Sequence, residues 1–226
     1  KPNITESWRE RSKILQSHNE ASIIANIPPQ SYTMTSASRA PVLAIFSGSA
    51  RTGSVNTKLA RAAERMGAEL GATTKFLDLG AAHYDLPIYN NDLEDSQGMP
   101  DTAMRLKDDL GIADGWIVAS PEYNGFVPPL LLNAMTWASR GDSPEAGMYA
   151  TFQNKSAIVV SASPGAMGGM RSLGPNRELL QNLGVNVLPQ AVAIGGAFKA
   201  FEESTGDLVD DKQKGMLQRA VHALYL

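Results

Sequence analysis

Short apolar runs alternate with amphipathic segments along the chain from about residue 42 onward. The runs are rich in β-branched and aromatic residues, which favours buried parallel strands. They lie at 42–46, 73–79, 116–120 and 156–161, with a broken fifth run at 185–188 and 191–194. The segments between them predict helices at 57–66, 102–110, 129–139, 169–183 (interrupted near Gly174 and Pro175) and 210–224, and a long loop that contains 86–92. This alternation predicts an α/β fold, a parallel sheet with helices on both faces.

Residues 1–40 differ in composition from the rest of the chain. Ser, Thr, Asn and Pro are frequent there, and Pro28 with Pro29 interrupts any helix. The sequence predicts a helix over about 5–24, which would have some of its apolar residues on one side. We interpret residues 1–40 as an N-terminal extension or arm, and residues 41–226 as one domain.

Basic residues among serines in this extension are typical of an organellar targeting segment, but three glutamates argue against that interpretation. We therefore expect a cytoplasmic location, with organellar targeting as the weaker alternative.

Composition limits the classes of function. Hydrophobic residues make up 43% of the 226 residues and charged residues 19%, which is enough apolar material for a sizeable core. The net charge of -3 argues against a nucleic-acid-binding surface. The chain has no cysteine, which excludes disulfides and thiolate catalysis, and its three histidines have no metal-ligand spacing. No apolar stretch approaches the ~20 residues needed to span a membrane.

A loop of Gly and Ser between the first strand and the first helix of the domain predicts an anion site. The start of a helix offers unpaired N–H groups and a partial positive charge. Ser49, Ser54 and Asn56 add neutral donors, and Arg51 adds a cation suited to phosphate. No Lys follows Gly53 as in a nucleotide triphosphatase loop, and the G-x-G-x-x-G pattern is absent, so a single phosphate is favoured. An ordinary helix cap is the alternative.

Two further loops follow the third and fourth strands, at the same edge of a parallel sheet, where ligands bind. Residues 121–125 supply Tyr123 and the backbone near Asn124 and Gly125, which could hold a flat aromatic ring. Residues 163–169 are rich in glycine, so their N–H groups could approach the polar edge of that ring. One phosphate and one planar heterocycle describe flavin mononucleotide, FMN. If each loop is considered alone, the alternative for residues 121–125 is a turn anchored by a buried tyrosine. The alternative for residues 163–169 is a bare flexible turn.

In these motifs the sequence resembles the NADPH-dependent FMN reductase family, which has the flavodoxin-like fold and includes chromate and quinone reductases. The matching stretches are 48–56, 86–94, 121–124, 131–140 and 163–169. The resemblance covers about residues 41–200 and implies a five-stranded parallel sheet in the order 2-1-3-4-5. It also implies bound FMN and hydride transfer from NADPH or NADH to a small-molecule acceptor, such as quinones, flavins, azo compounds or metal oxyanions like chromate. An FMN-binding electron carrier or redox sensor is the alternative function.

The resemblance also assigns binding residues. It implies that Ser49, Arg51, Ser54, Val55 and Asn56 hold the FMN phosphate, that Pro121, Glu122, Tyr123, Asn124 and Gly125 flank the isoalloxazine, and that Ser163, Gly165, Gly168 and Gly169 line its other edge. No side chain is expected to act as a general acid or base, because the chemistry belongs to the flavin. Leu132 and Thr136 depart from the Lys and Asp frequent in the family, which removes an ion pair. The family forms dimers or tetramers, and residues 87–94 resemble a loop near the subunit boundary.

Overall fold

The structure of the protein, a computed structural model, describes residues 39–141 and 147–225. Its centre is a five-stranded parallel sheet in the order β2-β1-β3-β4-β5, which confirms the predicted flavodoxin-like fold class. The strands are β1 Val42–Ser47, β2 Thr73–Leu77, β3 Gly115–Ala119, β4 Ser156–Ala162 and β5 Asn186–Ile194. The predicted N-terminal extension and its helix over 5–24 lie almost wholly outside the described residues.

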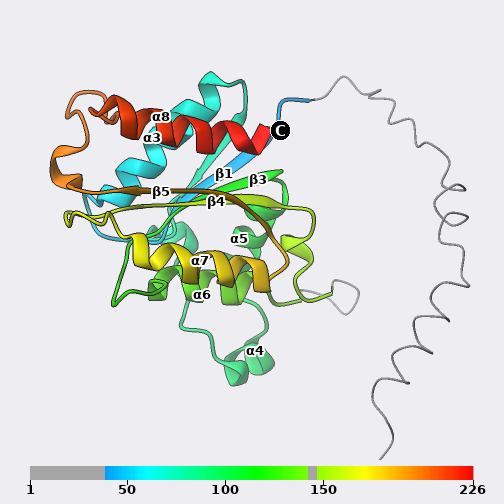
Figure 1. Ribbon diagram of the computed structural model, residues 1–226. Helices are drawn as coiled ribbons and strands as arrows, with labels where there is room; N and C mark the ends of the chain where they lie inside the picture. Colours follow the sequence, from blue (N-terminus) through cyan, green and yellow to red (C-terminus); the bar gives the residue numbers. More distant parts are fainter. Residues whose placement is uncertain (1–38, 142–146, 226) are drawn as a thin grey trace, which may run out of the picture. The chain divides into compact units, whose positions relative to one another are not determined.

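Helices cover both faces of the sheet (Figure 1). They are α3 Val55–Glu69, α4 Asn91–Gln97, α5 Asp101–Gly111, α6 Pro129–Ala138, α7 Met170–Asn182 and α8 Asp211–His222, with single 3₁₀ turns η1 Ala82–Tyr84, η2 Ala150–Phe152, η3 Ala197–Lys199 and η4 Ala223–Tyr225. Side chains of successive strand residues point to opposite faces. Leu43 and Ile45 of β1 therefore pack with α3 and α8, while Ala44 and Phe46 pack with α5, α6 and α7.

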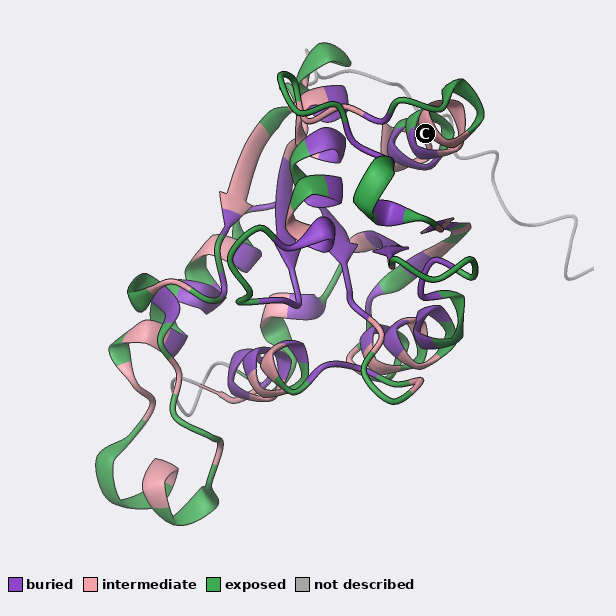
Figure 2. Ribbon diagram, turned by 90° about the vertical axis from the view of Figure 1, so that its left-hand side faces the viewer, coloured by how far each residue is buried: buried purple, intermediate pink, exposed green. Residues whose placement is uncertain are grey.

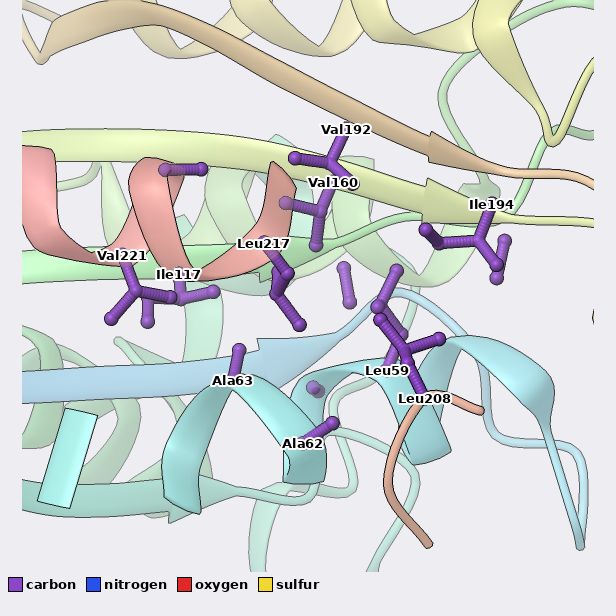
Figure 3. Packing of buried hydrophobic residues seen from close by; sticks show 14 of the residues in the cluster. Leu59, Ala62, Ala63, Ile117, Val160, Val192, Ile194, Leu208, Leu217 and Val221 are labelled. Carbon is purple, nitrogen blue, oxygen red and sulfur yellow. The ribbon is translucent and has the colours of Figure 1, made fainter. Parts of the chain in front are cut away.

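The face covered by α3 and α8 shows why these helices form. In Figure 3, Leu59 and Ala63 of α3 and Leu217 and Val221 of α8 converge on the branched side chains of the strands. These positions repeat every four residues, so each helix presents one apolar stripe to the sheet. Burial of that stripe, rather than intrinsic helix propensity, provides most of the helix stability.

Two predicted elements, one loop and one helix, differ from the structure. The long loop predicted around 86–92 contains the short helix α4, which begins after the N-cap residue Asn90, whose side chain accepts a hydrogen bond from the Asp92 amide at 2.9 Å. No residue of α4 is buried, so it leaves no apolar periodicity in the sequence. Residues 86–100 project from the body of the domain (Figures 1 and 2).

The helix predicted at 169–183 was expected to be interrupted near Gly174 and Pro175, and this prediction was wrong. Helix α7 continues through Pro175. Proline at this position has no N–H, so the helix loses one backbone hydrogen bond. Leu173, Asn176 and Leu180 on either side of it are buried and keep the helix packed against the domain. The fifth strand, by contrast, was predicted to be broken. The structure shows a shift in the register of its pairing with β4, between Ala157 and Val159 of β4.

None of the helices in the described ranges has the length and apolar character that crossing a bilayer requires.

The start of α3 is fixed by two side chains. Ser54 is the N-cap, and its hydroxyl accepts hydrogen bonds from the amides of Asn56 at 3.2 Å and Thr57 at 3.4 Å. Asn56 is buried, and its side-chain amide donates to the Ala162 carbonyl and accepts from the Ala162 amide, both at 2.9 Å. Asn56 therefore joins the start of α3 to the carboxyl end of β4.

We expect Asn56→Ala to lower the free energy of unfolding of the apoprotein by about 2–4 kcal/mol, because it leaves two buried backbone groups without partners. Urea denaturation followed by circular dichroism measures this. Asn91→Ala is the matched control, because the side chain of Asn91 hydrogen-bonds Asp95 on the exposed surface of α4. A loss for Asn56→Ala no larger than that of the control would contradict the bridging role.

Candidate functional site

The loops after β1, β3 and β4 meet at the carboxyl edge of the sheet, which Figure 2 views face on. They surround a hollow of about 260 Å³ that we call the rim cleft. Its walls are Ser49, Arg51, Ser54, Val55, Asn56, Pro121, Glu122, Tyr123, Ala162, Ser163, Pro164 and Phe198. Nine of the residues predicted to bind the cofactor are in this set. The structure thus brings them together, and their binding roles stay predictions.

Two further hollows adjoin the rim cleft. One, of about 230 Å³, shares Glu122 and Ser163 with it and is lined by the glycines of residues 163–169 and by Arg171. The other, of about 640 Å³, shares Glu122 and Tyr123 and reaches Asn124, Phe126 and Pro129. The three hollows therefore share wall residues along the rim, and we call them together the rim depression. Of the predicted residues, Gly125 lines none of them and instead shapes a turn.

A separate hollow of about 340 Å³ lies between the C-terminal ends of α3 and α8, lined by residues such as Met66, Leu70 and His222. Helix α3 begins at the rim and has 15 residues, so its far end is about 20 Å from the loops. This hollow is remote from the predicted site.

The loop between β1 and α3 has the properties of an anion site. Its start is tied to β3, because the Gly48 amide donates to the Ala119 carbonyl at 2.9 Å. The amides of Thr52, Gly53 and Val55 have no acceptor among the described residues. They lie at the start of α3, where the helix dipole adds partial positive charge. Free amides and positive potential together favour a bound phosphate.

Arg51 is exposed on this loop and lines the rim cleft. No carboxylate in the ranges 39–141 and 147–225 forms an ion pair with its guanidinium. Most other arginines of the described chain are paired, for example Arg65 with Asp207 at 2.6 Å and Arg140 with Glu94 at 3.0 Å. An arginine beside free helix amides and without an acidic partner is suited to charge-assisted hydrogen bonds with phosphate.

Asn56 was also predicted to contact the phosphate. Its carbonyl oxygen and one N–H of its amide are occupied by Ala162. An amide nitrogen carries two hydrogens, so one remains available to a ligand in the rim cleft. The helix cap that the sequence left as the alternative is formed by Ser54, and this cap leaves other amides of the loop available to an anion.

The loop after β3 is held by an ion pair. The Glu122 carboxylate accepts hydrogen bonds from Arg171 Nε at 2.7 Å and from the Arg171 amide at 3.2 Å, and also from Arg171 Nη2. Its side chain is nearly buried, whereas that of Arg171 is largely exposed. The pair fastens the loop to the first turn of α7. Glu122 is therefore committed to positioning rather than to proton transfer.

Residues 123–126 form a tight turn in which the Phe126 amide donates to the Tyr123 carbonyl at 3.0 Å. Asn124 and Gly125 have φ of 56° and 76°, the left-handed values of a type I′ turn. Tyr123 is 46% exposed, so it is not the buried anchor that the sequence left as an alternative. Its ring is available to a planar ligand.

The third loop is also ordered by specific contacts, rather than being a bare turn. The amides of Gly196 and Ala197 donate to the carbonyls of Gly165 at 3.3 Å and Ser163 at 3.1 Å, so the loop is fastened to the segment after β5. A Cβ on Gly168 would lie 2.7 Å from backbone atoms of Ala193 and Ile194. Glycine at 168 is thus required by close packing against β5. Its own amide donates to Gly165 at 3.1 Å, whereas the Met167 and Gly169 amides have no acceptor in the described chain.

Sequence reasoning missed Arg171 and Phe198. Phe198 lies in η3, directly after β5, and lines the rim cleft although it is 75% exposed. The same rule that located the other loops applied here, because β5 also ends at this edge. Its run is followed by Gly195 and Gly196 and then by this aromatic residue. Only the broken pattern of β5 concealed the signal.

The residues present fit FMN. The anion site has neutral donors and one cation, without a polyphosphate lysine, and it adjoins a depression with an exposed aromatic wall. Free amides at Met167 and Gly169 could pair with polar atoms of a heterocycle. The donors are thus of the kind that a single phosphate and a planar ring require.

Comparison with known proteins agrees with this fit. Residues 41–199 match the NADPH-dependent FMN reductase family. A quinone reductase of Pseudomonas putida is 36% identical over 180 residues, 79% of this chain and 90% of that protein. A quinone reductase of Escherichia coli is 30% identical over 165 residues, 72% of this chain and 82% of that protein.

A solved structure shows the same fold. The flavoenzyme NAD(P)H:(acceptor) oxidoreductase FerB of Paracoccus denitrificans has a TM-score of 0.67 and 28% identity, and the match covers 82% of this chain and 95% of that one. The chain therefore belongs to the NADPH-dependent FMN reductase family, as its motifs indicated, and is an oxidoreductase that uses FMN and NAD(P)H.

Proposed function

We propose that the protein is an NAD(P)H:quinone reductase that uses the rim depression to bind FMN and then each substrate in turn. One observation carries the proposal. A loop suited to a single phosphate lies next to an open hollow with aromatic side chains in its wall, at the carboxyl edge of the sheet. Two of the relatives are themselves named quinone reductases. The relatives favour an enzyme over an electron carrier, and so does the cationic Arg51, which has no carboxylate partner among the described residues.

The chemistry supplied by bound FMN is acceptance of a hydride from NAD(P)H and delivery of two electrons to the quinone. In balance, NAD(P)H, one proton and a quinone give NAD(P)⁺ and a hydroquinone. Arg51, the hydroxyls of Ser49 and Ser54, Asn56 and the amide of Val55 hold the phosphate. Residues 121–125 and the segment 163–169, through Ser163, Gly165, Gly168 and Gly169, flank the ring. The additional proton comes from solvent, because Glu122 is engaged by Arg171 and the depression is open.

We further propose that the protein self-associates through the projection formed by residues 86–100. Its base is fixed to α6, because the Pro87 carbonyl accepts hydrogen bonds from Asn133 Nδ2 at 3.0 Å and Trp137 Nε1 at 2.8 Å. Tyr89 Oη donates to Glu94 at 2.8 Å, a hydrogen bond that raises the pKa of the phenol.

This ordered projection presents Ile88, which is 79% exposed, and the outer face of α6 presents Leu132, which is 42% exposed. An exposed isoleucine on a firmly held segment favours burial against a second copy of the chain, in a dimer or tetramer. The proposal includes a cytoplasmic location, where NAD(P)H is available, and no nucleic-acid partner, in keeping with the net charge of -3.

We expect initial rates with NADPH and a benzoquinone to give parallel lines in double-reciprocal plots, because one depression serves both substrates in succession. High quinone concentrations should compete with NADPH. The same assay with NADH establishes the donor preference. Intersecting lines without quinone inhibition would mean that both substrates bind together, and no turnover at all would favour the electron carrier.

We expect Arg51→Ala to weaken FMN binding about 10- to 100-fold, the loss of roughly 1.5–3 kcal/mol from charge-assisted hydrogen bonds. Titration of apoprotein with FMN, followed by quenching of flavin fluorescence, measures the Kd. Arg105→Ala on α5 is the matched control, since Arg105 is also exposed and has no carboxylate partner in the described part of the chain. Equal Kd values for parent and Arg51→Ala would exclude the phosphate role.

We expect Ile88→Asp to shift the protein to a smaller species in analytical ultracentrifugation, because a carboxylate would be desolvated in the interface. Ile112→Asp is the control, since Ile112 is 58% exposed at the end of α5, away from the projection. A monomeric parent, or two variants that behave alike, would refute this interface.

A further inference from the structure

Phe198 lines the rim cleft, whose walls also include Ser49, Arg51 and Ser54 of the anion site. It is 75% exposed, so most of its apolar surface remains in water, which is unfavourable for a phenylalanine. The neighbours on its own turn are buried, with Ala197 at 1%, Ala200 at 6% and Phe201 at 8% exposure. These buried alanines and Phe201 anchor the turn in the core that α3 and α8 cover. Packing of the domain thus explains why apolar residues stand at 197, 200 and 201. It does not explain why position 198 is aromatic.

The turn that carries Phe198 is held firmly. Gly196 has a φ of 61°, which places η3 at a sharp change of direction after β5. Its amide and that of Ala197 are bonded to the loop after β4, and the Lys199 amide donates to the Gly196 carbonyl at 3.0 Å. The Ala200 carbonyl accepts from the Val209 amide at 3.0 Å. A fixed turn that holds an apolar ring beside an anion site resembles a preorganised binding wall more than a mobile loop tip.

We infer that Phe198 is a cofactor-retaining residue: its ring packs on the part of FMN next to the phosphate and makes the flavin a retained prosthetic group rather than an exchanging substrate. This inference rests on the proposed function. The ring excludes water from one side of the phosphate site, which strengthens the hydrogen bonds from the α3 amides and from Arg51. It also contributes apolar contact to the CH groups of the ligand. Both effects slow cofactor release more than they alter hydride transfer.

The test measures the FMN dissociation rate, followed by flavin fluorescence after dilution, and the Kd from titration of apoprotein. We expect Phe198→Ala to raise both about 10- to 100-fold. Phe198→Tyr retains the ring and should stay near the parent. Ile112→Ala is the matched control, because Ile112 is 58% exposed at the end of α5 and lines none of the three hollows at the rim. Apoprotein melting temperatures of all four proteins identify any variant that fails to fold, and Phe198→Leu then replaces Phe198→Ala.

The outcomes separate the inference from the function on which it rests. A parent that binds no FMN would refute the proposed function as well. A parent that retains FMN, with Phe198→Ala releasing it at the same rate, would overturn the inference alone. A variant with normal FMN retention but a raised KM for NADPH would also overturn it, because the ring would then serve the nucleotide donor.

Discussion

Two hydrogen bonds between the side chain of Asn56 and the backbone of Ala162 hold the rim together. They join the first turn of α3, which supplies free amides, to the strand end that leads into Ser163. From Ser163 the connection continues to Ala197 of η3 through a backbone hydrogen bond of 3.1 Å. Hydrogen bonds therefore link the loops after β1, β4 and β5 to one another. The loop after β3 joins them through Glu122 and Arg171, so all four loops keep a fixed relation to one another.

This arrangement suits a reaction in which the cofactor performs the chemistry. Such a protein needs a binding surface of constant shape more than it needs a reactive side chain. The charged groups at the rim divide accordingly. Glu122 and Arg171 neutralise each other and position a loop, whereas Arg51 has no carboxylate partner in the described part of the chain. The hydroxyl of Ser54 serves the protein by capping α3 and borders the cleft at the same time.

The succession of strands and helices and the three loops could be predicted because their signals are local, whereas the order of the strands in the sheet came only from the resemblance to the family. Buried parallel strands such as 116–120 are continuous apolar runs, and loops at strand ends show Gly, Ser and Tyr directly in the sequence. Helix α4 left no apolar periodicity in the sequence, since none of its residues is buried. The contact of Arg171 with Glu122 spans 49 positions of the chain, so no local pattern in the sequence reveals it. The role of Gly168 was likewise hidden, because the backbone that it meets comes from β5.

Gly168 has a consequence for the interpretation of mutational scans. Any side chain at this position would place a Cβ 2.7 Å from backbone atoms of Ala193 and Ile194, so the third loop or β5 has to shift. The hollow lined by this loop would change shape even though glycine at 168 has no side chain with which to touch a ligand. A scan scored by flavin content would therefore rank Gly168 beside Arg51, and a scan scored by protein abundance would separate them. The same defect in activity would then have two origins, a displaced scaffold at 168 and a missing charge at 51.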